Sequence, residues 1–83
     1  MSIKIIITPE QCKAARDLLT WKQIDLSEKS EISPSTIADF ERGSRELTGR
    51  TLKELKRTLE DAGIEFINDD EGLGVKLLQN KQK

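Results

Sequence analysis

The stretch that decides the fold is residues 23–43, QIDLSEKSEISPSTIADFERG. Its second half opens with Ser33 and Pro34, a favoured N-cap residue followed by a proline suited to the first helical position. Two short helices that cross closely need a small residue at the fifth position of this stretch, counted from Gln23. They also need apolar residues at its fourth, tenth, fifteenth and eighteenth positions. These positions hold Ser27 and, in order, Leu26, Ile32, Ile37 and Phe40. The stretch therefore predicts two crossed helices, over about 22–29 and 34–42, which is the layout of a helix-turn-helix.

A longer helix is expected before this stretch. Thr8 and Gln11 form a capping box around a proline, and apolar residues recur at spacings of three and four along residues 9–19. Thr20 and Gln23 are again three residues apart, so Thr20 is the expected N-cap of the second helix.

Another helix and a hairpin are expected after the stretch. Leucines recur at helical spacing in residues 50–62, and Gly63 is a natural stop. Residues 64–67 and 75–78 flank a turn rich in Asn, Asp and Gly, and they predict two strands. A two-stranded hairpin is marginal in water, and residues 3–7, IKIII, are a candidate third strand from the same or a second chain.

The composition excludes several kinds of chemistry. The 83 residues include no histidine, no tyrosine and one cysteine, Cys12. An intrachain disulfide, an ordinary zinc site and a histidine-based catalytic group are therefore excluded, and we expect no enzyme, no cofactor and no metal site. The apolar tract 5–7 is too short for a membrane span or signal peptide, so a cytoplasmic protein is expected. The length predicts a single domain over residues 1–83, with a helical core at 9–62.

Residues 9–62 resemble the Cro/repressor (Xre-like) family of DNA-binding transcriptional regulators. The resemblance is carried by the segments TPEQCKAARDLL at 8–19, WKQIDLS at 21–27 and STIADFERG at 35–43. It implies a mainly α fold, a four- to five-helix repressor-like domain, to which this chain adds a C-terminal β-hairpin and the candidate N-terminal strand.

The resemblance also sets expectations for individual residues. Arg16 and Glu41 occupy positions where the family joins the first helix to the third by a salt bridge. Glu31 stands where the family usually has glycine, so it must adopt a left-handed conformation or reshape the turn. Ser30 stands where an apolar residue is usual. We expect Trp21, which precedes the second helix, to lie in the core or to form a hydrophobic staple rather than to stack on bases.

The same resemblance implies a site for double-stranded DNA, with the second helix of the motif in the major groove. Ser35, Ala38 and Asp39 would lie near base edges, with Pro34 and Thr36 beside them. None of these side chains can make the bidentate guanine contact of an arginine, although Asp39 can accept a hydrogen bond from cytosine. Direct readout is therefore expected to be modest. The residues implied for phosphate or minor-groove contacts are Lys22, Gln23, Arg42, Ser44, Arg45 and Arg50.

The charge distribution is compatible with a DNA partner. The net charge of -1 argues against one at first sight. However, residues 42–57 hold six basic and two acidic side chains, whereas residues 60–71 hold six acidic and no basic ones. The total therefore averages a basic and an acidic region. Lys53, Lys56 and Arg57 can equally be the solvated face of a helix, and a solvated face is also the alternative for the 34–42 helix.

Two functions follow from these observations. The first is a sequence-specific transcriptional regulator, a repressor that acts as a homodimer on a pseudo-palindromic site. The second is an antitoxin-like or adaptor protein whose β-strand region binds a partner protein by strand addition. The two are compatible, because antitoxins of this shape also bind DNA.

Overall fold

The computed structural model describes residues 6–69 and 72–78. Over these residues the chain forms four helices followed by an antiparallel β-hairpin, which confirms the predicted fold class. The elements are α1 (Pro9–Leu19), α2 (Gln23–Ser30), α3 (Pro34–Glu41), α4 (Gly49–Asp61), β1 (Ile64–Asp69) and β2 (Gly72–Leu77).

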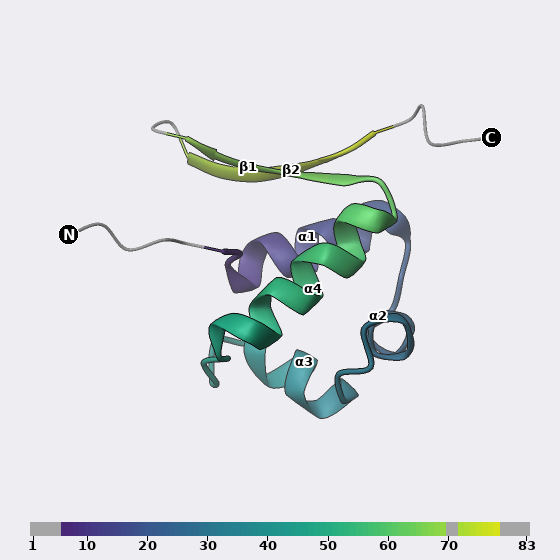
Figure 1. The fold of residues 1–83 in the computed structure, drawn as a ribbon, viewed down its shortest axis with the longest axis vertical. Helices are drawn as coiled ribbons and strands as arrows, with labels where there is room; N and C mark the ends of the chain where they lie inside the picture. The colour runs from purple at the N-terminus through teal and green to yellow at the C-terminus, as the bar shows by residue number, and fades with distance from the viewer. Residues whose placement is uncertain (1–5, 70–71, 79–83) are drawn as a thin grey trace.

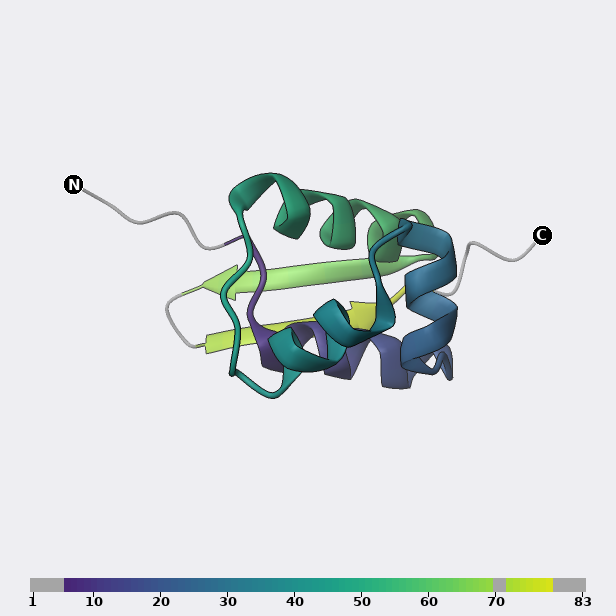
Figure 2. The same ribbon diagram turned by 90° about the horizontal axis from the view of Figure 1, so that it is seen from below.

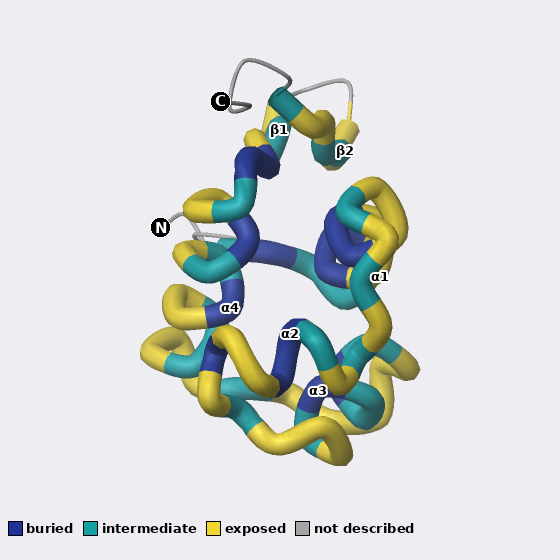
Figure 3. Tube along the Cα trace, turned by 90° about the vertical axis from the view of Figure 1, so that its right-hand side faces the viewer, coloured by how far each residue is buried: buried dark blue, intermediate teal, exposed yellow. Residues whose placement is uncertain are grey.

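The hairpin and the α2–α3 pair occupy opposite ends of the molecule (Figure 1). The hairpin lies over α1 and α4, with β1 on the α4 side and β2 on the α1 side (Figure 3). Seen from below, α2 and α3 face the viewer and the hairpin lies behind them (Figure 2). A surface formed by α3 therefore points away from the hairpin.

The core lies where all four helices meet. Leu26, Ile37, Leu55 and Leu59 come from α2, α3 and α4 and are fully buried. Cys12, like Ala15 on the same face of α1, is also fully buried, as expected for a core residue. Burying a leucine or isoleucine side chain contributes about 1.5–3 kcal/mol, so these few residues supply much of the stability of a chain this small.

The start of α1 confirms the predicted capping box, and α2 begins close to the predicted residue, but the predicted Thr20 cap of α2 is wrong. Gln11 N donates to Thr8 Oγ1 at 3.1 Å, and Thr8 N donates to Gln11 Oε1 at 3.0 Å. Thr20 does not cap α2, because it ends α1 in the left-handed conformation with φ 56°. An N-cap must be extended, and Lys22 is, with its N–H bonded to Asp25 Oδ2 at 2.7 Å.

The strands of the hairpin are longer than the sequence indicates. Its register runs from Ile64 paired with Leu77 to Asp69 paired with Gly72. Most of the expected loop, residues 68–74, therefore belongs to the strands, because the ladder continues through its polar residues. Ile64 is buried at the start of β1.

The candidate N-terminal strand lies mostly outside the described residues, which exclude residues 3–5. Ile6 and Ile7 are described and form no strand, although Ile7 is buried in the core. The sheet of the described residues therefore contains β1 and β2 only.

Gln11 fastens the hairpin to α1. Its side-chain nitrogen lies 2.9 Å from Asn68 Oδ1, 3.0 Å from Gly74 O and 3.4 Å from Ile67 O. The residue is 3% exposed. One buried amide thus contacts both strands while its oxygen caps α1.

Candidate nucleic-acid interface

The α3 helix has one buried face and one outward face. It starts at Ser33, whose Oγ accepts from Thr36 N at 3.2 Å, and Pro34 occupies the first turn. Ile37 and Phe40 are buried. Residues at three- and four-residue spacing on the other side are exposed or half-buried, and we call them the outer stripe. The outer stripe consists of Ser35, Ala38, Asp39 and Arg42.

The turn between α2 and α3 accommodates both departures from the family pattern. Glu31 adopts the left-handed conformation, with φ 64°, and its N–H donates to Ser27 O at 2.8 Å. Ser30 is 4% exposed, and its hydroxyl accepts from Ile32 N at 3.3 Å. Glu31 thus takes the conformation usually given to glycine, and the buried hydroxyl of Ser30 has a hydrogen-bond partner.

A buried ion pair fixes α3 against α1. Arg16 Nε and Nη2 each donate at 2.8 Å to one carboxylate oxygen of Glu41, and both side chains are less than a tenth exposed. Arg16 Nη1 also donates to Trp21 O at 2.9 Å. Gln23 Nε2 adds a bond to Glu41 Oε1 at 3.0 Å, which joins the start of α2 to the end of α3. This fork-shaped contact sets orientation as well as distance.

The protonation states match this geometry. Burial alone raises the pKa of the Glu41 carboxyl, but hydrogen bonds from Arg16, Gln23 and Cys12 and the charge of Arg16 hold it below its usual value. Burial, with the adjacent Glu41 charge, raises the pKa of the Cys12 thiol far above its ordinary range. The thiol is therefore protonated, and its Sγ donates to Glu41 Oε2 at 3.3 Å. Cys12 is thus a core donor rather than a reactive thiolate.

The two charged residues of the outer stripe are bonded to each other. Arg42 Nη2 donates to Asp39 Oδ1, and the two side chains are 63% and 35% exposed. Ser44 N and Oγ donate to the main-chain oxygen of Asp39 at 3.0 and 3.1 Å. The structure therefore brings Asp39, Arg42 and Ser44 together, as an interface at the end of α3 requires.

The two predicted phosphate-contacting residues at the start of α2, its N-cap Lys22 and its first residue Gln23, differ in their surroundings. Lys22 is exposed. Gln23 is half-buried and its amide is engaged with Glu41. Gln23 can still offer its main-chain N–H, because the first N–H groups of a helix have no partner within the helix.

The remaining arginines flank α3. Arg45 is exposed in the segment between α3 and α4. Arg50 is exposed in the first turn of α4, and it lines a groove of about 480 Å³ together with Glu31 and Ile32. Arg50 therefore lies beside the start of α3, whereas Arg42 lies at its end.

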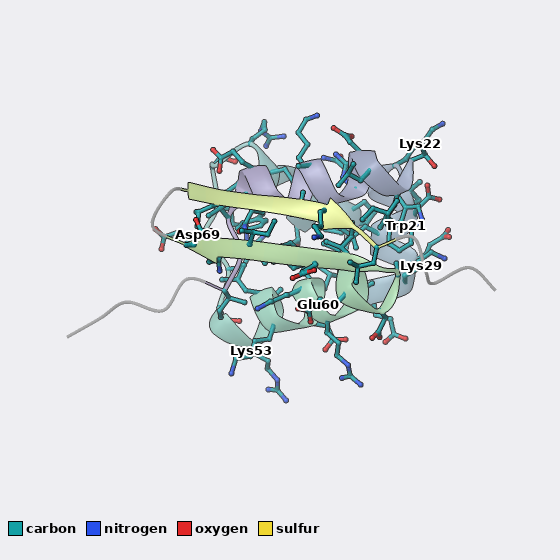
Figure 4. The ribbon with its side chains drawn as sticks, turned by 90° about the horizontal axis from the view of Figure 1, so that it is seen from above. Trp21, Lys22, Lys29, Lys53, Glu60 and Asp69 are labelled. Carbon is teal, nitrogen blue, oxygen red and sulfur yellow. The ribbon has the colours of Figure 1, made fainter. Side chains whose placement is uncertain are left out.

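The two charged regions of the sequence adjoin on α4, where Arg57 and Asp61 line one groove, and their far ends lie at α3 and on the hairpin. Lys53 extends outward from α4, and Asp69 lies near the turn of the hairpin (Figure 4). The acidic residues 60, 61 and 65 lie at the end of α4 and on β1, on the hairpin side of the molecule, while Asp70 and Glu71 are outside the described residues. The end formed by α2 and α3 is thus distinct from the acidic end.

Two side-chain contacts, of which the second lies at this site, are absent from the sequence-based predictions. The Gln11 bonds to the hairpin and the Gln23 bond to Glu41 each join segments far apart in the chain. A glutamine in a capping box uses only its oxygen there, so the unused amide nitrogen of Gln11 was the available signal. Trp21 packs against the core, as expected, and Lys29 Nζ lies 5.2 Å from the centre of its ring (Figure 4).

Comparison with protein families matches residues 13–60 to a helix-turn-helix family model. The matched range begins within α1 and ends within α4, so it contains the whole α2–α3 motif. No curated protein matches the chain. No helix in the described residues has the length and apolar character needed to cross a membrane. Because the match covers more than half of the chain, the protein belongs to the Xre/Cro-like helix-turn-helix family of DNA-binding regulators.

Proposed function

We propose that the protein is a sequence-specific transcriptional repressor that binds duplex DNA as a homodimer, with α3 in the major groove. The observation that carries this proposal is the way α3 is held. Its inner face is buried and the Arg16–Glu41 pair fixes it to α1, while the outer stripe stays accessible. A rigid helix with an open polar face suits readout of base edges.

In this proposal, the bases are contacted by small side chains of α3. Pro34 and Ser35 are exposed at the start of α3, where recognition helices approach the bases, and Thr36 and Ala38 lie beside them half-buried. Pro34 and Ala38 suit a thymine methyl, Ser35 and Thr36 can donate or accept, and Asp39 suits the cytosine amino group. A bidentate contact would add about 1–3 kcal/mol of discrimination, and none of these side chains makes one with guanine.

Phosphate contacts supply most of the affinity in this proposal. The donors available to the DNA backbone lie around both ends of α3 and at the start of α2. They are Lys22, the main-chain N–H of Gln23, Arg42, Ser44, Arg45 and Arg50. So few contacts predict a moderate affinity that falls with salt.

Exposed apolar residues support a homodimer. Leu18 on α1 and Leu73 and Leu77 on β2 are 43%, 45% and 37% exposed. The two elements pack against each other, and Leu73 lines a groove together with Ala14 of α1. In a two-fold dimer formed there, the leucines of one chain would pack against the same leucines of the second chain.

The arginine contacts are tested by replacing Arg42 and Arg45 together with alanine. We expect weaker binding to every duplex, and the slope of log affinity against log salt should fall by roughly 0.9 for each phosphate that the arginines no longer neutralise. The matched control replaces Lys13 and Lys76, two exposed lysines on α1 and β2, so that the same amount of charge is removed. Equal binding by the arginine variant and the wild type would contradict the docking.

Selection of bound fragments from a random duplex library then tests sequence preference and symmetry. If the protein binds as a homodimer, the enriched sequence should be a pseudo-palindrome. The centres of its half-sites should be about 34 Å apart or a multiple of that distance. Placing the selected site at a promoter should lower transcription when the protein is present. Higher transcription would show an activator instead of a repressor.

A second candidate function is recruitment of a partner protein by the hairpin. It is supported by the position of the hairpin at the end opposite α3, where a bound partner would leave the recognition helix accessible. Capture on immobilised operator DNA tests it, with mass spectrometry of the retained proteins. A partner retained by the wild type and absent with Glu65→Lys, a change at an exposed residue of β1, supports this function, whereas equal retention by both chains contradicts it.

A further inference from the structure

The outer stripe of α3 carries one positive and one negative side chain, and they neutralise each other. Ser35 and Ala38 are uncharged, while Arg42 donates to Asp39. The other carboxylate of α3, Glu41, is 4% exposed and paired with Arg16. Asp39 is therefore the one acidic side chain that α3, a helix described over its whole length, presents outward.

This arrangement has a cost in the major groove. A carboxylate can only accept hydrogen bonds, and the bases offer it only the amino groups of cytosine and adenine. Opposite any other group, Asp39 would lose water without gaining a donor and would face nearby phosphates of like charge. Arg42 would also have to break its hydrogen bond to Asp39, or share its donors between Asp39 and a phosphate, before it could bind the DNA backbone.

The main chain keeps Asp39 in this position. Ser44 donates twice to the main-chain oxygen of Asp39, so the last turn of α3 and the following loop hold each other. The side chain is 35% exposed, less than that of Arg42 at 63%. Of the pair, Arg42 is thus the more exposed side chain, and Asp39 is the residue whose main chain Ser44 holds.

We propose that Asp39 determines specificity by exclusion: it restrains Arg42 and penalises every duplex that lacks an amino group opposite it. The inference rests on the proposed DNA-binding function and assigns Asp39 a role beyond a single base contact. Unfavourable contacts with the wrong partner are as effective a source of specificity as favourable contacts with the right one.

The test compares Asp39→Ala and Asp39→Asn with Asp17→Ala. The control removes the same charge and opens another exposed ion pair, between Lys13 and Asp17 on α1. Binding is measured by fluorescence anisotropy at several salt concentrations, with a random-sequence duplex and with the duplex selected by the wild type. Circular dichroism confirms that each variant is helical, and Asp39→Asn nearly preserves the shape of the side chain.

Asp39→Ala should bind the random duplex about tenfold more tightly, because a like charge is removed and Arg42 is released. Its salt slope should steepen by roughly 0.9, the value for one additional phosphate contact. Preference for the selected duplex should fall about tenfold or more, the range of one base contact. Asp39→Asn should shift the preferred base at that position from cytosine to adenine.

Asp39→Ala would overturn the proposal if it bound the random duplex no more tightly than wild type and kept the same preferred sequence. The same gain in Asp17→Ala would also overturn it, because the effect would then be one of net charge. Failure of the proposed function looks different, since the wild-type protein itself would then bind no duplex at any salt concentration.

Discussion

Glu41 accepts hydrogen bonds from three side chains although it is almost fully buried. Arg16, Gln23 and Cys12 all donate to its two oxygens. A buried ion pair adds little net stability once desolvation is counted, but removing one partner costs about 3–5 kcal/mol, because the other charge is left uncompensated. The pair therefore matters mainly for the orientation of α3.

Acid should lower the free energy of unfolding, because it protonates Glu41. Its pKa is lower in the folded chain than in the unfolded chain, so the stability it contributes is present above about pH 4.3, the ordinary glutamate value, and is lost as the pH falls through the lowered pKa. Glu41→Gln should lower the free energy of unfolding by about 3 kcal/mol at pH 7 and flatten its decline in acid. Urea unfolding from pH 7 to pH 2 measures both effects.

Asp17→Asn provides the comparison for this experiment. It breaks the exposed pair with Lys13, in which both side chains are about 60% exposed, and should cost less than about 1 kcal/mol. It should keep the acid profile of the wild type. A wild-type profile in Glu41→Gln would show that another carboxylate controls the acid response.

At the scale of helices and strands, the attachment of the hairpin to α1 depends on Gln11. Gln11→Leu removes the hydrogen bonds to both strands and one half of the α1 capping box, which should cost about 2–3 kcal/mol. We expect the amides of β1 and β2 to exchange faster while those of α2 and α3 keep most of their protection. Amide hydrogen exchange followed by NMR measures this.

Gln23→Leu is the matched control, because it removes a glutamine bond at the other end of the molecule. It should leave the exchange of the hairpin amides unchanged. If Gln11→Leu instead exposed all helices equally, the hairpin would be part of the same cooperative unit as the helix-turn-helix.

For the whole molecule, the position of the hairpin limits how two copies can share one duplex. The hairpin and α3 lie at opposite ends (Figures 1 and 3). A dimer that stacked the outer faces of two hairpins would turn its two α3 helices away from each other. A dimer on one duplex would therefore associate through a side of the molecule, and the groove between α1 and β2 that Leu73 lines is the candidate surface.

The homodimer can be tested at one of these leucines. Leu73 lines a groove of about 240 Å³ between β2 and α1, with Ala14 on the helix side. Leu73→Asp should convert the dimer to a 9.4 kDa monomer in sedimentation equilibrium at micromolar concentration. The control is Ile24→Asp, which changes an isoleucine of α2 that is 47% exposed. This variant should remain dimeric. A wild-type chain that sediments as a monomer would contradict the homodimer itself.

Much of the fold was predictable because its signals are local. The capping box at Thr8 and the Ser33-Pro34 helix start each lie within one turn, and the structure confirms both. The Thr20 cap was wrong because two helix ends compete for that residue, and the need of α1 for a left-handed C-cap prevailed. The Arg16–Glu41 contact came only from the family resemblance, since no local pattern joins residues 25 positions apart.

Sequence alone is sufficient here for the four helices, the N-caps of α1 and α3 and the two-faced character of α3, because these depend on neighbours within about four residues. It does not show that the Gln11 amide reaches Asn68, 57 residues away, or that Gln23 is engaged with Glu41. Nor does it show that Arg42 bonds Asp39 or that the hairpin lies opposite α3. These features depend on how helices and strands pack and on which rotamers that packing allows, and both are settled only when the whole chain has folded.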